Sequence, residues 1–317
     1  YTTFEYMRRF NPVCMIKPDD MWAVSRATDV EYVLSNPQLF SSTGINLAYD
    51  SEWLSEKCRA PRLILSQDPP EHDSQRMTVT GAVAPPNLAK LEPLIRERTC
   101  KVLDSLPEDE TFDWVETVSI ELTTRMLATL FDFPFEDRKK LARWSDIVFA
   151  IPEPGGVIES HEQRQEELME CVQYFSGLWE ERRENPGDDL VSMLVHGEAT
   201  KDMSAAEHLG NLLLLIVGGN DTTRNTMSGS VYGLNTFPEQ YDKLVANPDL
   251  IRNMVQEIIR WQTPLSYMRR TATRDCELGG KQIKKDDQLL MWYLSANRDA
   301  TVFDNADAVD IERENAD

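Results

Sequence analysis

A long apolar stretch broken by two glycines and an acid constrains the fold more than any other part of this chain. Residues 212–229 read LLLLIVGGNDTTRNTMSG, so an apolar run passes directly into Gly218, Gly219, Asn220 and Asp221. Glycine inside a helix costs roughly 0.5–1 kcal/mol relative to alanine, and a carboxylate beside a buried run is costly without a partner. We therefore predict that another group approaches the backbone here and that these four residues belong to a functional site.

Signals on either side of this stretch predict one long helix. Ser204 and Glu207 match a capping box, which places the helix start near Ala205, and Pro238 ends the helix. A helix of about 30 residues is roughly 45 Å long at 1.5 Å per residue. Because its apolar part has no polar face, we expect this helix to be buried in the middle of the molecule.

Two other interpretations of residues 218–223 remain open from the residues alone. The first is a turn between two shorter helices, with Thr222 capping the second one. The second is a phosphate-binding loop, although the Lys-Ser or Lys-Thr pair that ends such a loop is absent. In a continuous helix, by contrast, Thr222 and Thr223 can donate their hydroxyls to preceding carbonyls and loosen the helix locally.

The rest of the chain predicts a mainly α fold with small β elements (α+β). A strand is predicted at Met21–Val24 and a second β region at 271–299, where Gly-Gly and Asp-Asp pairs supply turns. Residues 44–63 and 150–160 read as loops. No repeat or interdomain linker is evident, which predicts a single domain over residues 1–317. Helices are predicted over 28–35, 91–106, 114–130, 163–183, 209–234 and 250–261.

Charge and hydropathy exclude several classes of protein. With 54 acidic and 33 basic residues, the net charge is -21, so no basic surface for nucleic acid or anionic lipid is expected. The longest apolar run, 212–217, is far shorter than the roughly 20 residues that cross a bilayer, and no signal peptide opens the chain. We therefore expect a cytoplasmic protein without a transmembrane segment.

Cysteine and histidine spacing argues against a protein-bound metal ion. The five cysteines are scattered and never spaced as Cys-x-x-Cys, which disfavours a disulfide framework or a zinc site and fits a reducing cytoplasm. His161, His196 and His208 have no metal-ligand spacing and read as ordinary polar residues. A metal-dependent hydrolase is therefore a poor interpretation.

Two pairs of polar residues have helical spacing. His72 and Arg76 lie four apart, so both can donate from one helix face to a pair of carboxylates. Glu257 and Arg260 lie three apart, and a buried carboxylate satisfied by guanidinium groups would have a structural role. Each pair taken alone is more commonly a solvated surface pair.

The order of these motifs along the chain resembles that of the cytochrome P-450 superfamily of haem-thiolate monooxygenases, and the resemblance covers essentially the whole chain. The segment DPPEHDSQR precedes GGNDTT, which is followed by EIIRW, MRRTATRD, SANRD and DIER. The resemblance implies the P-450 fold, a large helical domain with small β-sheet elements. It implies haem b (iron protoporphyrin IX) as cofactor and O2 as co-substrate. It also implies electrons from NAD(P)H through a ferredoxin and its reductase as partners.

The resemblance assigns roles residue by residue. Asp221 would relay protons and Thr222 would hydrogen-bond the oxygen that is being activated, while Gly218 and Gly219 leave room for oxygen. Three further cofactor-binding residues would hold the haem propionates, and three residues would form a structural ion network. The propionate residues are His72, Arg76 and Arg270, and the network is Glu257, Arg260 and Arg313.

One family feature is missing from the sequence. The loop Phe-Gly-x-Gly-x-x-x-Cys-x-Gly, which carries the cysteine ligand of the iron, has no match. Because Tyr1 is not an initiator methionine and that loop normally follows the position of Arg313, we expect a partial domain that is truncated at both ends. The iron-ligating cysteine is then expected beyond Asp317, with no metal ligand in this chain, and the chain as given should be inactive.

The substrate prediction rests on a closer resemblance. The segments VGGNDTTRNTMSG and TPLSYMRRTATRD are similar to those of the bacterial subfamily that hydroxylates medium-chain n-alkanes at the terminal carbon. A small hydrophobic substrate is therefore expected, with terpenes or fatty acids as alternatives. A haem-free, all-α binding or scaffold protein is the alternative from another class. Candidate residues for an apolar substrate pocket are Ile45, Leu47, Ile151, Val157, Leu265 and Met268.

Overall fold

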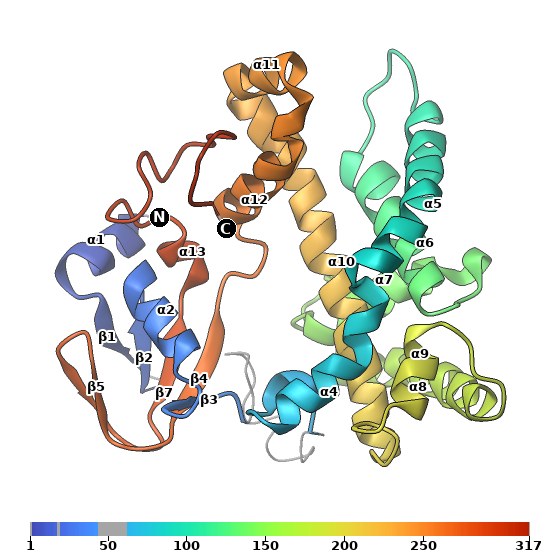
Figure 1. Ribbon diagram of the computed structural model, residues 1–317, viewed down its shortest axis with the longest axis horizontal. Coiled ribbons are helices and arrows are strands. Elements are labelled where there is room, and N and C mark those ends of the chain that lie inside the picture. Colours follow the sequence, from blue (N-terminus) through green and yellow to red (C-terminus); the bar gives the residue numbers. More distant parts are fainter. Residues whose placement is uncertain (1, 18–19, 44–61, 317) are drawn as a thin grey trace. The chain divides into compact units, whose positions relative to one another are not determined.

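The computed structural model describes residues 2–17, 20–43 and 62–316, which form two compact units (Figure 1). Of the described residues, unit 1 comprises 2–17, 20–43, 65–69 and 229–316, and unit 2 comprises 62–64 and 70–228. The described residues are mostly helical with small sheets, so the predicted fold class is confirmed. The single domain stays a prediction.

Unit 1 contains the β structure that was predicted near both ends of the chain. Its five-stranded sheet has the order β1-β2-β7-β4-β3, in which β2 and β7 are parallel and the other neighbours are antiparallel (Figure 1). Strands β5 and β6 form a separate hairpin, and Gly279 and Gly280 turn it with φ of 55° and 74°. The strands are β1 (Val13–Ile16), β2 (Met21–Val24), β3 (Phe40–Ser41), β4 (Met268–Ala272), β5 (Cys276–Leu278), β6 (Lys281–Ile283) and β7 (Gln288–Met291).

The helices of unit 1 pack around two apolar clusters. The sheet cluster includes the buried side chains Phe40, Leu289 and Met291, and the second cluster joins Ile258 to Ile311. Burial of such side chains contributes about 1.5–3 kcal/mol each. The helices are α1 (Thr2–Phe10), α2 (Ala27–Ser35), α11 (Pro238–Ala246), the 3-10 turn η5 (Pro248–Leu250), α12 (Ile251–Gln262) and α13 (Tyr293–Ala296).

Unit 2 is helical and has an aromatic core. Phe133 packs against the rings of Trp144, Tyr174 and Phe175 at centroid distances of 4.6–6.2 Å. The helices are α4 (Glu71–Thr80), α5 (Pro85–Asp104), α6 (Glu121–Leu130), α7 (Lys139–Phe149), α8 (His161–Glu184) and α9 (Leu190–His196). Short 3-10 turns lie at η2 (Gly81–Val83) and η4 (Phe135–Asp137), and a π-helical segment, η3 (Val115–Ile120), precedes α6. The 3-10 turn η1 (Ile64–Ser66) has residues in both units.

The helix α10 (Ala205–Thr236) is continuous over 32 residues, so a turn at residues 218–221 is wrong (Figure 1). Its start is the predicted one. Ser204 Oγ accepts from the Glu207 amide at 3.3 Å, and Glu207 Oε2 accepts from the Ser204 amide at 2.8 Å. Within this unbroken helix, the hydroxyl of Thr222 bonds back to the Gly218 carbonyl.

Candidate functional site

The two glycines of α10 have different surroundings. A Cβ on Gly219 would lie 2.8 Å from Leu127 Cδ2 on α6, so any larger residue would have to displace that side chain. A Cβ on Gly218 would meet nothing within 4 Å. Gly219 is therefore explained by helix packing, whereas Gly218 borders open space that a ligand can occupy.

Thr222 lies one turn after Gly218 and makes a back-bond within the helix. Its Oγ1 donates to the Gly218 carbonyl at 2.8 Å. Because the hydroxyl proton is used in this bond, the oxygen keeps lone pairs that can accept a hydrogen bond from a donor beside it. The hydroxyl is therefore suited to hold a hydrogen-bonding ligand next to the open space at Gly218.

Asp221 is held in a chain of charged groups. Its Oδ1 lies 2.5 Å from Arg224 Nη2, and Arg224 Nη1 lies 3.0 Å from Asp146 Oδ1 on α7. Burial raises the pKa of Asp221 above the ordinary aspartate value, Arg224 opposes this shift, Asp146 adds to it, and the hydroxyl of Ser145 opposes it. Asp221 thus accepts a proton more readily than a solvated aspartate, as a proton relay requires.

Replacing Asp221 by asparagine should raise the stability of the protein at pH 7. Because the folded-state pKa of Asp221 is raised, its ionised form opposes folding at neutral pH. This opposition disappears as the pH falls below the ordinary aspartate pKa of about 3.9, so the gain should shrink as the pH is lowered. Urea unfolding at a series of pH values measures the difference.

Asp275→Asn is the control, because the pKa of Asp275 is shifted in the opposite direction. Lys284 and the Lys285 amide lower the pKa of Asp275, so its ionised form favours folding and its loss should not stabilise the protein at pH 7. Equal or lower stability of Asp221→Asn at pH 7 would contradict the assignment of Asp221 as a carboxyl group with a raised pKa.

Asn220 points away from the open space and bonds to α6. It is fully buried, and its Oδ1 accepts from Thr123 Oγ1 at 3.0 Å. Its Nδ2 has no hydrogen-bond partner within the part of the chain that the structure describes. Sequence reasoning missed Thr123, Arg224 and Asp146. The spacing of Asp221 and Arg224 was a usable signal, because residues three apart share a helix face.

The predicted propionate residues of unit 2 lie on α4. His72 Nδ1 is 2.8 Å from Asp73 Oδ1, and the side chain of Arg76 is exposed. Among residues 2–17, 20–43 and 62–316, no ion pair joins Arg76 to a carboxylate. One turn of helix separates the two side chains, so both are available to an acidic group on the same face of α4.

Arg270 lies in unit 1, on β4. Its Nη1 donates to the Arg269 carbonyl at 2.8 Å, and the described residues give it no carboxylate partner. Burial raises the pKa of nearby Tyr293, and Arg270 opposes that shift. A guanidinium without an acidic partner fits a carboxylate ligand. Within unit 1, this donor chemistry fits a haem propionate.

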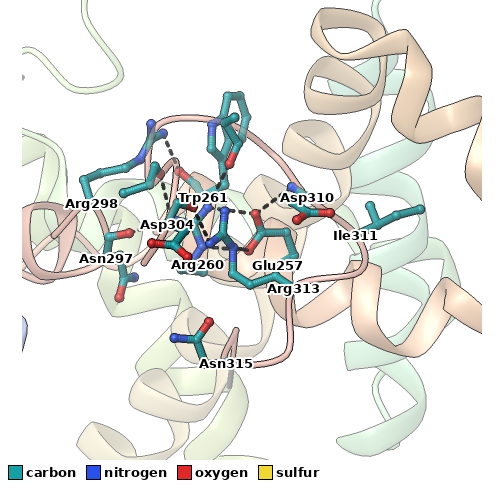
Figure 2. A network of polar contacts seen from close by, with 12 residues as sticks. Glu257, Arg260, Trp261, Asn297, Arg298, Asp304, Asp310, Ile311, Arg313 and Asn315 are labelled. Atoms are coloured by element: carbon teal, nitrogen blue, oxygen red, sulfur yellow. Dashed lines mark hydrogen bonds and ion pairs between the residues drawn. The ribbon is translucent and has the colours of Figure 1, made fainter. Parts of the chain in front are cut away.

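Glu257, Arg260 and Arg313 form a buried ion network in unit 1, which Figure 2 shows. Glu257 has no exposed surface, and Arg260 donates to both of its oxygens, with Nε at 2.7 Å and Nη2 at 2.8 Å. Arg313 Nε donates at 3.0 Å and the Asp310 amide at 2.8 Å. Four donors therefore saturate the carboxylate, so neither oxygen is free to react and Glu257 has a structural role.

The same network orders the irregular segment that follows α13. Arg260 Nη1 donates to the carbonyls of Asn297 at 2.6 Å and Ala306 at 2.8 Å. Arg313 Nη1 donates to the Asp304 carbonyl at 2.7 Å (Figure 2). These bonds satisfy carbonyls that have no helix or strand to pair with, so the network fixes this segment without regular secondary structure.

The predicted substrate residues have different environments. Ile151 and Val157, in the loop after α7 of unit 2, are 64% and 48% exposed. In unit 1, Leu265 is 42% exposed and Met268 is buried. Ile45 and Leu47 lie outside the described residues. The structure thus leaves three of these apolar side chains accessible and places Met268 in the sheet core.

None of the cysteines that the structure describes resembles a metal ligand. Cys171 is buried in the core of unit 2, and burial raises its pKa to about 12. Cys14 and Cys276 lie on strands with pKa values raised by burial, and Cys100 is exposed on α5. Throughout residues 2–17, 20–43 and 62–316, no group of three or more potential ligands (His, Cys, Asp, Glu) is placed to hold a metal ion.

Two of the histidines that the sequence predicts to be ordinary polar residues hydrogen-bond to backbone carbonyls. His196 Nε2 lies 2.8 Å from the Arg182 carbonyl, and His208 Nε2 lies 2.9 Å from the Met203 carbonyl. Burial lowers the pKa of His208 to about 4, so it is neutral at physiological pH. Both histidines therefore bond to carbonyls of the nearby backbone.

Comparisons with known proteins agree with the motifs. The family model described as Cytochrome P450 matches residues 2–315. Linalool 8-monooxygenase of Pseudomonas putida is 33% identical over 98% of this chain and 79% of its own length. Methyl-branched lipid omega-hydroxylase of Mycobacterium bovis is 31% identical over 92% of this chain and 69% of its own length.

Solved structures extend the similarity to the fold. Cytochrome P450-153 from Novosphingobium aromaticivorans is 44% identical with a TM-score of 0.88, over 99% of this chain and 80% of that one. CYP153D17 from Sphingomonas sp. PAMC 26605 is 48% identical with a TM-score of 0.89, over the same shares. Within the described residues, no helix is long and apolar enough to span a membrane.

These similarities decide the class of the protein. Cytochrome P450 proteins are haem-containing oxidoreductases of the monooxygenase type, which use O2 and take electrons from NAD(P)H through redox partners. The family model matches nearly all of the chain, and the relatives are more than 30% identical to it. Both comparisons therefore give the same family as the motifs. The chain belongs to the cytochrome P450 family.

Proposed function

We propose that this protein hydroxylates medium-chain n-alkanes at the terminal carbon, inserting one oxygen atom of O2 into an unactivated C–H bond. The arrangement of Gly218, Asp221 and Thr222 on α10 carries the reaction type, because it puts a proton relay and a hydroxyl beside open space. The substrate rests on the resemblance of residues 217–229 and 263–275 to the alkane-hydroxylating subfamily. The identity of 44–48% to two solved P450 structures numbered 153 supports it.

The residues of this chain have defined tasks in that reaction. When bound, haem supplies the activation of O2 and the electron transfer that amino acids lack. Gly218 leaves space beside α10, and the hydroxyl oxygen of Thr222 would accept a hydrogen bond there and so orient a proton donor. Asp221 takes a proton from solvent, which its raised pKa favours, and passes it toward Thr222. By the family resemblance, His72 and Arg76 would hold haem propionates through their donor groups, and so would Arg270.

The thiolate ligand of the iron is proposed to lie outside residues 1–317. The environments of the described cysteines support this, since Cys171 with a pKa of about 12 stays protonated and none of the others lies in a glycine-rich loop. Cys58 lies outside the described residues, and its sequence context SEKCRAPR also lacks the glycines of the family loop.

The electron donor is proposed to be a ferredoxin, itself reduced by a ferredoxin reductase that uses NAD(P)H. Residues 1–317 contain no pattern typical of a flavin or iron–sulfur domain, so these residues need an electron source outside themselves. A flavodoxin, another low-potential electron carrier, offered in place of the ferredoxin in a reconstituted assay shows whether the ferredoxin requirement is specific.

A terpene or a branched lipid is the second candidate substrate. The relative named Linalool 8-monooxygenase and the relative named Methyl-branched lipid omega-hydroxylase favour it, because each covers most of this chain at 31–33% identity. Both candidates share an apolar chain and differ in branching, so one competition assay separates them.

The test is the product of octane oxidation. Protein expressed from its complete gene, with ferredoxin, reductase and NAD(P)H, should convert n-octane mainly to 1-octanol, as resolved by gas chromatography. Linalool and a methyl-branched fatty acid are offered in parallel at equal concentration. Internal octanols alone, or turnover of linalool but not of octane, would contradict terminal alkane hydroxylation.

A further inference from the structure

Three arginines of unit 2 surround one aromatic ring. The guanidinium carbons of Arg98, Arg125 and Arg138 lie 5.5, 5.0 and 4.4 Å from the centre of the Phe135 ring. They come from α5, from α6 and from the residue before α7, and α5 and α6 lie side by side (Figure 1). An aromatic face attracts a cation at such distances. The fold thus gathers three positive charges from three segments, and we call Arg98, Arg125 and Arg138 the arginine cluster.

The arginine cluster shares a single carboxylate. Glu121 Oε1 accepts from Arg125 Nε at 2.6 Å, and both oxygens of Glu121 accept from Arg138 Nη2, at 2.7 and 3.0 Å. Within the described residues, no acidic side chain pairs with Arg98. Three guanidinium charges and one carboxylate leave a net charge of +2, in a chain whose net charge is -21. The cluster is therefore a local positive site on an acidic protein.

The other acids in these segments do not neutralise the cluster. Glu97 pairs with Lys101 on α5, and Asp137 lies 3.6 Å from Lys140 Nζ. Glu136 is exposed to solvent, where its charge is screened. In the part of the chain that the structure describes, none of these carboxylates forms an ion pair with the cluster. Its positive charge is thus available to a ligand.

Several donors of the cluster are not used by the fold. Arg98 Nη1 donates to the Arg125 carbonyl at 2.6 Å and to Thr129 Oγ1, whereas its Nε and Nη2 bond to none of the described residues. Arg125 Nη1 also bonds to none of them, and Arg138 Nε is buried without a partner among them. A buried donor without a hydrogen bond is costly, so an acceptor beside these groups is favoured.

The electrostatics of Arg98 also favour a negative ligand. Burial lowers the pKa of Arg98, Arg125 lowers it further, and Glu97 opposes these shifts. Burial raises the pKa of Glu121, but hydrogen bonds from Arg138 and Arg125 outweigh burial and lower it. Glu121 is therefore ionised and held by two arginines, while the surroundings of Arg98 destabilise its charge. A negative group beside Arg98 would remove this destabilisation.

We propose that the arginine cluster binds a doubly charged oxyanion, which is inorganic phosphate or the phosphate group of a phosphate monoester. A phosphate group carries a charge of about −1.5 to −2 at pH 7, which neutralises the net charge of the cluster. Its oxygens accept the paired N–H groups that a planar guanidinium offers. Phe135, which is 39% exposed, adds an apolar surface beside the anion. The site is built from unit 2 alone and is independent of the substrate that the protein oxidises.

Isothermal titration calorimetry of the haem-bound protein, expressed from its complete gene, tests this site. Sodium phosphate and sodium sulfate should each bind wild type saturably, in buffers matched to the same ionic strength with sodium chloride. Arg98→Gln should weaken phosphate binding about tenfold, the scale of one lost charge-assisted hydrogen bond. Arg98 is the position to change because its loss leaves no carboxylate unpaired.

Arg96→Gln is the matched control. Arg96 lies on the same helix, is exposed and pairs with Glu92 Oε1 at 3.0 Å, so this variant changes the net charge equally but outside the cluster. It should change the Kd for phosphate by less than about twofold. Haem-bound protein is used because haem occupies the predicted propionate residues, which are then closed to phosphate.

Phenyl phosphate separates the two sources of the anion. If it binds more tightly than inorganic phosphate and Phe135→Leu removes the difference, the ligand is the phosphate group of an organic molecule. If the two bind equally, the ligand is inorganic phosphate. Aromatic contacts contribute about 0.5–1.5 kcal/mol, so a difference of about threefold or more is expected for an organic ligand.

Hydrogen exchange of the wild-type protein locates the site without a variant. Phosphate should slow exchange in residues 131–138, which include Phe135 and Arg138, and leave residues 184–189 between α8 and α9 unchanged. The proposal is wrong if wild type binds neither phosphate nor sulfate, or if phosphate leaves exchange in 131–138 unchanged. It is also wrong if Arg98→Gln and Arg96→Gln weaken phosphate binding equally, because binding would then follow net charge alone.

Discussion

Replacing Glu257 by alanine should lower the free energy of unfolding by about 3–5 kcal/mol, the usual effect of removing one partner from a buried ion pair. Glu257 has no exposed surface and accepts from Arg260, Arg313 and the Asp310 amide. Without it, two buried guanidinium groups lose their counter-charge. A total stability of about 5–15 kcal/mol is typical, so much of the protein should be unfolded or without haem.

Urea unfolding followed by tryptophan fluorescence measures this loss as a lower midpoint. Glu277→Ala is the matched control, since Glu277 is exposed on β5 and its loss should change stability by less than about 0.5 kcal/mol. A loss below about 1 kcal/mol for Glu257→Ala would mean that the network is solvated in solution and contributes no more than a surface pair.

Replacing Thr222 by alanine should reduce the product formed per NAD(P)H by at least about tenfold, because positioned proton transfer contributes about 10²–10⁴ to a rate. Its hydroxyl bonds to the Gly218 carbonyl and is proposed to hold a proton beside the open space. Without that hydroxyl, NAD(P)H consumption should continue while the reducing equivalents leave as hydrogen peroxide. Product and peroxide are quantified together against NAD(P)H consumed.

Two further variants show whether the loss of product in Thr222→Ala comes from the missing hydroxyl at this position. Thr222→Ser keeps the hydroxyl and should restore most of the coupling. Thr236→Ala removes a hydroxyl with the same back-bond, to the Tyr232 carbonyl at 2.8 Å, at the exposed end of α10. It should leave the product yield unchanged. Undiminished product per NAD(P)H in Thr222→Ala would contradict the proposed role.

The parts of the fold that depend on local signals were predictable from the sequence. The capping box of Ser204 and Glu207 and the apolar run after it predicted the start and continuity of α10, because both act within a few residues. The pair Glu257 and Arg260 was predictable for the same reason, since residues three apart share a helix face. Arg313 followed only from the family resemblance.

The start of α5 was missed because its first turn contains Pro85 and Pro86, which read as helix breakers although proline is favourable at the first helical positions. The helices α1, α4, α7, α9 and α11 were also not predicted. These are short segments of 7–11 residues, whose periodicity spans too few turns to stand out from chance.

Contacts between distant parts of the sequence were beyond prediction. The bond from Thr123 to Asn220 and the pairing of Arg224 with Asp146 join helices that only the fold brings together. The left-handed Thr263 is a case of its own, because its residue type and the following proline both favour another conformation. Tertiary hydrogen bonds override those preferences, and no local pattern records them.

The most direct test of the account is the carbon monoxide difference spectrum of the reduced protein, expressed from its complete gene and measured together with its haem content. The account predicts one haem per chain and the red-shifted Soret band that a thiolate ligand gives to the ferrous carbonyl form. No haem uptake would contradict it and favour a haem-free binding protein. A Soret band at the position of histidine-ligated haem would contradict thiolate ligation.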